Sequence, residues 1–67
     1  MVIIKWTNKF SNETGYVESV STKGKCFVNT FEAKDAKQYT ERGAKGMLKK
    51  LEDFGETENN DFELVEI

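Results

Sequence analysis

The chain has 67 residues, which is enough for one small domain and no more. It contains no histidine, so the usual general base and the commonest metal ligand are both missing. Its single cysteine excludes an internal disulfide and a multi-cysteine zinc site. We therefore expect one non-enzymatic domain that carries neither a cofactor nor a metal.

The charge is distributed unevenly along the chain. All ten lysines and arginines lie in residues 1–50, which have a net charge of +5, whereas residues 51–67 carry seven acids and no base. Such a split indicates an interaction tail or a basic surface with its own acidic counterweight, but it also arises when ordinary surface charge happens to be segregated. The acidic stretch does not match an EF-hand loop, because counting from Asp53 places Glu58 where that loop requires glycine.

The N-terminal residues predict a strand followed by a polar loop. Val2–Thr7 alternates in a way that places Val2, Ile4 and Trp6 on one side. The apolar run is interrupted by Lys5 and is far too short for a signal peptide or a membrane helix. Residues 8–15 are polar and predict a loop, in which we expect Phe10 to pack down as an anchor.

The next two segments predict a β-hairpin. Tyr16–Ser21 and Lys25–Phe31 both have strand composition, and only three residues separate them. In this tight turn we expect Gly24 to supply a positive φ. We expect Cys26 to be a small buried or half-buried residue, and its being the only cysteine fits a reducing, cytoplasmic compartment.

The second half of the chain predicts a helix and a closing strand. Residues 32–38 favour one or two helical turns, and Thr40 is placed to cap a longer helix that ends before Gly55. Residues 56–60 predict a loop and Phe62–Ile67 a final strand. The apolar stripe of the helix has a 3.6-residue period and consists of Ala44, Met47, Leu48, Leu51 and Phe54.

This order, β-β-β-α-β, predicts an α+β fold with an antiparallel sheet of three to four strands and one main helix packed on one face. One helix covers only one face of a small sheet, yet the strands carry apolar residues on both sides. We therefore expect an exposed apolar patch on the other face, where a protein partner or a second copy docks. The alternative is that the loop of residues 8–15, with Phe10, folds over this face. The residues assigned to this patch are Ile3, Tyr16, Val20, Phe27 and Val65.

The predicted helix also offers a basic face. Arg42, Lys45 and Lys49 are spaced by three and four residues, so they share one side of the helix. Such a face is able to follow the phosphates of a nucleic acid. It is equally the ordinary solvated side of an amphipathic helix, and the sequence pI of about 5.1 is unlike that of most nucleic-acid-binding domains.

Several short runs resemble one group of bacterial proteins. Ala36–Thr40, the pair Gly43-Ala44, the leucines at 48 and 51, and Phe62–Ile67 are similar to small uncharacterised proteins encoded by phages and mobile elements of Gram-positive bacteria. The resemblance covers roughly residues 16–67. It implies a β-β-α-β fold and a bacterial or phage cytoplasm, and it transfers no functional residue.

Two classes of function follow from these features. The first is a small non-enzymatic protein-interaction module, such as an accessory protein of a phage or mobile element. The alternative is a nucleic-acid-binding module that uses the basic helix face. Nuclease-resistant capture of one host protein would favour the first, and a salt-dependent interaction with nucleic acid would favour the second.

Overall fold

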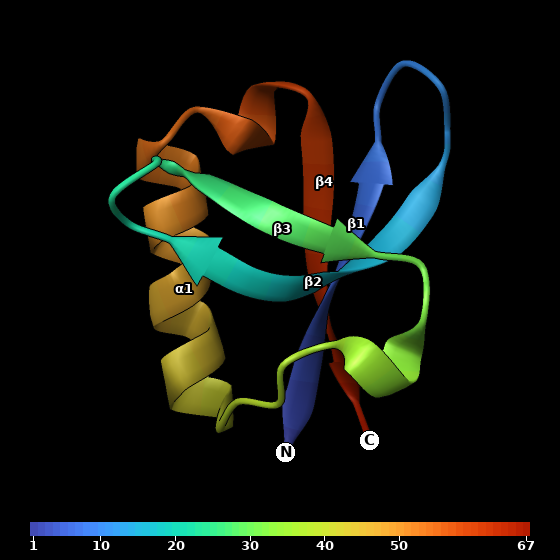
Figure 1. Ribbon diagram of the computed structural model, residues 1–67, viewed down its shortest axis with the longest axis vertical. Coiled ribbons are helices and arrows are strands. Elements are labelled where there is room, and N and C mark those ends of the chain that lie inside the picture. The colour runs from blue at the N-terminus through green and yellow to red at the C-terminus, as the bar shows by residue number, and fades with distance from the viewer.

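A computed structural model describes all 67 residues of the chain. Its four strands form one antiparallel sheet in the order β3-β2-β1-β4, and one main helix packs beside it (Figure 1). The predicted α+β fold is therefore confirmed. The elements in chain order are β1 (Val2–Asn8), β2 (Thr14–Ser21), β3 (Cys26–Thr30), the 3₁₀ turn η1 (Ala33–Asp35), α1 (Glu41–Asp53), the 3₁₀ turn η2 (Glu56–Glu58) and β4 (Asn60–Glu66).

The hydrophobic core forms between β1 and α1. Alternation along β1 directs Val2, Ile4 and Trp6 toward the helix, where they cluster with Val17 of β2 and Ala44 of α1. The partly buried residues that pack against this cluster come from every other major element; they are Val20, Phe27, Tyr39, Met47, Leu48, Phe62 and Leu64. The core is thus shared by all four strands and the helix.

A β-bulge bends β2 away from β1. The register between β2 and β3 shifts between Val17 and Ser19, and β1 pairs with β2 only over Lys5–Thr7. Figure 1 shows β2 crossing in front of β1 beyond this point. The edge of β1 that β2 leaves free is paired instead with Tyr39, since Val2 and Tyr39 exchange two backbone hydrogen bonds of 2.8 Å.

The helix follows the sequence prediction closely. The Thr40 hydroxyl accepts a hydrogen bond of 3.1 Å from the Gly43 N–H, so Thr40 is the N-cap. Ala44 and Leu51 are fully buried on the inner side. Gly55 has a φ of 84°, which is the left-handed conformation expected directly after a helix.

Three local predictions were wrong. In the β2–β3 turn, the residue with a positive φ is Lys25, at 52°, and not Gly24. The turn spans four residues, and the Gly24 N–H donates a hydrogen bond to the Ser21 hydroxyl. Cys26 is exposed because it opens an edge strand. Phe10 is 78% exposed and does not anchor its loop, since the Asn8 side chain holds the turn in a different way.

We expect Leu51→Ala to lower the free energy of unfolding by about 2–5 kcal/mol, because it leaves a cavity in a fully buried site. Denaturant-induced unfolding would measure the change. The exposed Lys50, one residue earlier, is the control, and Lys50→Ala should change stability by no more than about 0.5 kcal/mol. Equal effects of the two substitutions would contradict the assigned helix face.

Replacing Gly46 and Gly15 with alanine should change the stability of the protein in opposite directions. A Cβ at Gly46 would meet nothing within 4 Å, so Gly46→Ala should stabilise the exposed helical site by about 0.5–1 kcal/mol. A Cβ at Gly15 would lie 2.6 Å from Cζ2 of Trp6, so Gly15→Ala should destabilise by about 1–3 kcal/mol. Thermal melts of both variants would test this, and a stabilising Gly15→Ala would contradict the indole position.

Burial raises the pKa of Tyr39 above its ordinary value of 10.0. As the pH rises through 10, the unfolded chain therefore releases this proton before the folded chain does, and stability falls. Tyr39→Phe should remove part of this alkaline loss while leaving stability near neutral pH little changed. Unfolding free energies measured from pH 7 to about pH 11 would test this; identical pH profiles for the two proteins would contradict it.

Candidate binding surface

The structure does not bring the five predicted sheet-face residues together. Ile3 and Val65 are directly paired across β1 and β4, and Tyr16 lies on the same side, opposite Lys5. Val20 and Phe27 instead pack against the core on the helix side, because the bulge reverses the alternation of β2 after Val17 and Val20 pairs with Phe27 of β3. Ile3 is only 2% exposed. This face therefore offers no continuous apolar patch made of these five residues.

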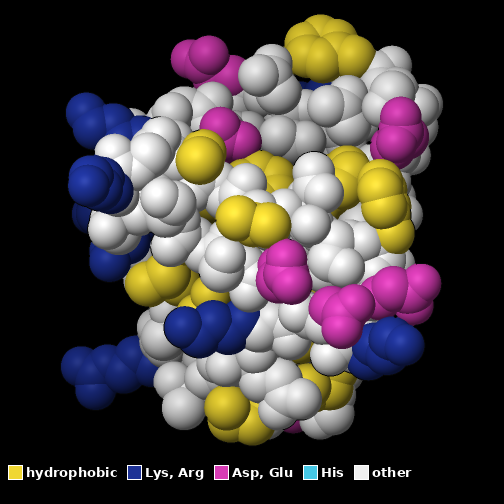
Figure 2. Space-filling view, in the orientation of Figure 1, with side chains coloured by type: hydrophobic (Ala, Val, Ile, Leu, Met, Phe, Trp, Pro, Cys, Tyr) yellow, Lys and Arg dark blue, Asp and Glu magenta, His cyan; other side chains and the backbone are white.

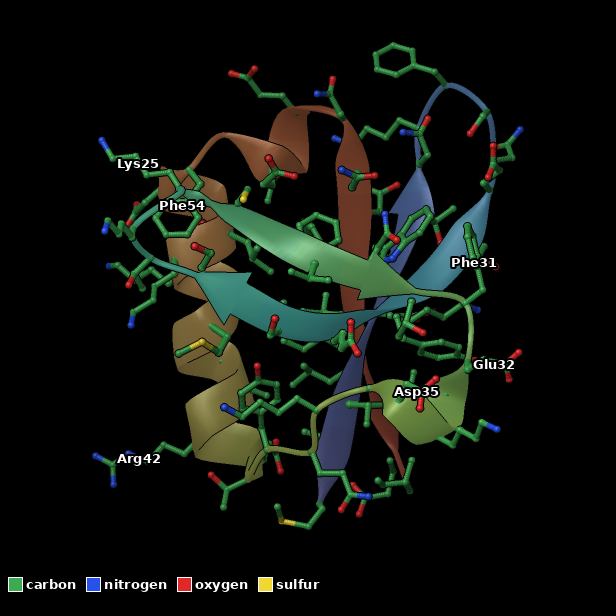
Figure 3. The ribbon with its side chains drawn as sticks, in the orientation of Figure 1. Lys25, Phe31, Glu32, Asp35, Arg42 and Phe54 are labelled. Atoms are coloured by element: carbon green, nitrogen blue, oxygen red, sulfur yellow. The ribbon has the colours of Figure 1, made fainter.

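The three residues of the predicted basic helix face are exposed, but they do not form one continuous surface. Arg42 projects into solvent from the first turn of α1 (Figure 3). Lys45 lies 3.4 Å from the carboxylate of Glu41, which is an exposed pair on the same helix. Lys45 and Lys49 face a groove to which Arg42 does not contribute.

This groove lies between the helix and the last strand and has a volume of about 520 Å³. Its two hydrophobic residues are Leu48 of α1 and Phe62 of β4. We name it the α1–β4 groove, and its lining is completed by Lys9, Lys45, Lys49, Glu52, Asp53, Thr57, Asn60 and Asp61. Three lysines thus stand among three carboxylates, so the groove has no formal net charge.

Lys9 closes one end of the α1–β4 groove. Its ammonium donates a hydrogen bond of 2.8 Å to the Thr57 carbonyl and lies 3.8 Å from a carboxylate oxygen of Asp61. Its backbone N–H donates to the Asn59 carbonyl at 2.8 Å. Sequence reasoning missed Lys9 because 48 residues separate it from Thr57 and no local pattern signals that contact.

Beside Lys9, the β1–β2 loop presents Phe10 on a fixed turn. The N–H groups of Phe10 and Ser11 both donate to the Asn8 side-chain oxygen at 2.9 Å. The loop is closed by the Asn8 N–H, which donates to the Glu13 carbonyl at 2.8 Å. Figure 2 shows a hydrophobic side chain standing clear of the surface at this loop. The exposed Phe10 thus directly follows Lys9, which lines the α1–β4 groove.

A second, smaller hollow of about 280 Å³ lies over Trp6 and Phe27. Two of its three amide side chains are used within the fold, because Asn8 donates to Asn60 at 3.5 Å and Asn60 donates to the Glu56 carbonyl at 3.3 Å. The aromatic rings below it pack edge to face, with 5.5 Å between the centroids of Phe27 and Phe62. These contacts give the hollow a structural role.

The chain contains no group of three or more side chains able to hold a metal ion, and none of its helices has the length and apolar character needed to cross a membrane. No protein family, curated protein or solved structure matches the chain. The surface features that remain as candidates for a function are the α1–β4 groove, the β1–β2 loop and the sheet edges.

Proposed function

We propose that this chain is a small non-enzymatic module that binds another protein through the end of the molecule formed by Phe10 and the α1–β4 groove. The observation that carries the proposal is the exposure of Phe10 on a hydrogen-bonded turn. Burying an aromatic side chain of this size in a partner yields about 1.5–3 kcal/mol. Because the turn is already ordered, little of that gain is lost to ordering the loop.

The groove next to Phe10 has the composition of a protein-binding surface. It combines an apolar floor, Leu48 and Phe62, with a rim of charged and hydrogen-bonding side chains. An apolar centre within a polar rim is the usual anatomy of a protein interface. A phosphate backbone would meet the carboxylates of Glu52, Asp53 and Asp61 in the same groove, so the charge pattern favours a protein partner.

The cellular setting of this activity is part of the proposal. The resemblance of Ala36–Thr40 and Phe62–Ile67 to small proteins of Gram-positive phages and mobile elements supports an accessory role in a bacterial cytoplasm. In that role the chain would act on a protein of the host.

We expect Phe10→Ser to weaken partner binding at least about tenfold, which corresponds to 1.4 kcal/mol, while leaving the melting temperature nearly unchanged. The measurement is the recovery of bound protein from a nuclease-treated lysate of a Gram-positive host by wild-type and variant chains. Phe31→Ser is the matched control, since Phe31 is also exposed but its ring packs against Trp6 at 6.0 Å. The control should lower stability and keep the partner.

Equal recovery by wild type and Phe10→Ser would show that the ring is not a contact. Loss of all bound material on nuclease treatment would favour the nucleic-acid alternative. In that case, neutralising Lys45 and Lys49 together should weaken the interaction and flatten its salt dependence.

A further inference from the structure

The outer edge of β4 has unpaired backbone groups. β4 pairs with β1 over seven consecutive residue pairs and with no other strand. The Asn59 carbonyl accepts from Lys9, and the Ile67 N–H donates to Met1, so odd-numbered residues of this segment bond toward β1. In an antiparallel ladder the bonding direction alternates, and the N–H and C=O groups of Phe62, Leu64 and Glu66 therefore face away from the sheet.

β4 lacks two of the devices that protect a sheet edge, a bulge and a proline, although it carries the acidic side chains of Asp61, Glu63 and Glu66. Its register with β1 runs without a bulge, and the chain contains no proline. β3, the other edge strand, has five residues and pairs with a bulged strand, whereas β4 has seven residues in unbroken register. The long, regular edge is therefore the better template for an added strand.

The β4 edge also adjoins the α1–β4 groove. Asn60, Asp61 and Phe62 contribute to the groove from the strand, and Leu48 contributes from the helix. Figure 1 shows α1 and β4 running beside each other in opposite directions. An extended segment lying along β4 would thus have a groove on its helix side to receive side chains.

We propose that a segment of the partner protein adds to this sheet as a fifth strand, antiparallel to β4, and that this segment alternates basic and apolar residues. The inference rests on the proposed protein-binding function and names its mode of recognition. Antiparallel addition is favoured because its hydrogen bonds are slightly more stable per residue than parallel ones.

The alternation follows from the two sides of the β4 edge. On the side away from the helix, the added strand would lie next to the carboxylate of Glu63, which is 65% exposed, whereas Asp61 lines the groove. Lysine or arginine opposite Glu63 forms a cross-strand pair of opposite charge. On the helix side, the neighbours are Leu48 and Phe62, which suit an apolar side chain.

A second copy of this chain fits the same edge poorly. Two β4 strands paired antiparallel would bring the carboxylates of Asp61 and Glu63 on one copy close to those on the other. Like charges placed opposite each other destabilise a strand pair. The partner strand is therefore expected to come from a different, basic segment.

The probe for this mode is an acetylated and amidated hexapeptide in which lysine alternates with valine. We expect it to bind at least tenfold more tightly than the same peptide with glutamate in place of lysine, measured by titration calorimetry. Bound peptide should also slow amide hydrogen exchange at Leu64 and Glu66, whose N–H groups face the free edge. Equal binding of the two peptides, or unchanged exchange at both amides, would overturn the proposal.

Backbone methylation of the probe tests the hydrogen bonds themselves. In an antiparallel pair, directly opposite residues share a face, and hydrogen-bonded pairs alternate with pairs that are not hydrogen-bonded. Phe62 and Leu64 are hydrogen-bonding positions of the free edge, because their N–H and C=O groups face away from β1. The valines would lie opposite Phe62 and Leu64, so N-methylation of the valine amides should abolish binding, whereas N-methylation of the lysine amides should not. If methylated valines leave binding unchanged, the peptide is not an added strand.

Charge reversal on the protein completes the test. Glu63→Lys should weaken binding of the lysine peptide at least tenfold and strengthen binding of the glutamate peptide. Glu32→Lys makes the same charge change near η1, well away from α1 (Figure 3), and should alter neither interaction. Identical effects of the two substitutions would point to non-specific attraction and contradict the proposal.

The two proposals fail separately in these experiments. If partner capture still depends on Phe10 but the lysine peptide shows no edge pairing, the binding function stands and strand addition is wrong. If Phe10→Ser captures the partner as well as wild type does, the proposed function fails whatever the peptide does.

Discussion

The contact between the Trp6 indole and Gly15 sets the geometry on which the rest of the fold depends. Trp6 lies directly opposite Gly15 in the β1–β2 pairing, and no side chain of any size fits between them. The indole N–H donates to the neighbouring Tyr16 carbonyl at 3.2 Å, which fixes the ring along β2. From this position the ring packs against Phe27 and Phe31, so a residue in the middle of β1 also places β3.

The uneven charge along the chain has a structural explanation in the pairing of the first and last strands. Lys5 faces Glu63 at 3.7 Å, Lys9 faces Asp61 at 3.8 Å, and the N-terminal ammonium lies 3.8 Å from Glu66. Each exposed pair contributes about 1 kcal/mol or less to stability. The Lys5–Glu63 pair also places charged side chains next to Ile3 and Val65, where the sequence alone suggested an apolar patch.

The parts of the fold that were predictable from sequence are those set by local chemistry. Thr40, the apolar stripe and Gly55 define the helix because capping and periodicity act within a few residues. The bulge was not predicted, although Val17 and Val20 both face the core while three residues apart, which an unbroken two-residue alternation does not allow. Only the helix wall of the α1–β4 groove was predicted from sequence, through Lys45 and Lys49. The other wall was not, because it comes from segments far away in the chain.

The pairing of β1 with β4 also has a consequence for how the chain folds. Val2 pairs with Glu66, so β1, one of the two central strands, takes its second neighbour from residues that are synthesised after the rest of the fold. Contacts between distant parts of a chain slow folding because a long loop must close before they form. The β2–β3 hairpin and α1 are able to form early from local contacts, whereas the core is complete only when β4 joins it. During synthesis, β1 therefore remains an open edge until the final strand is available, and in that interval the nascent chain is most exposed to pairing with other polypeptides.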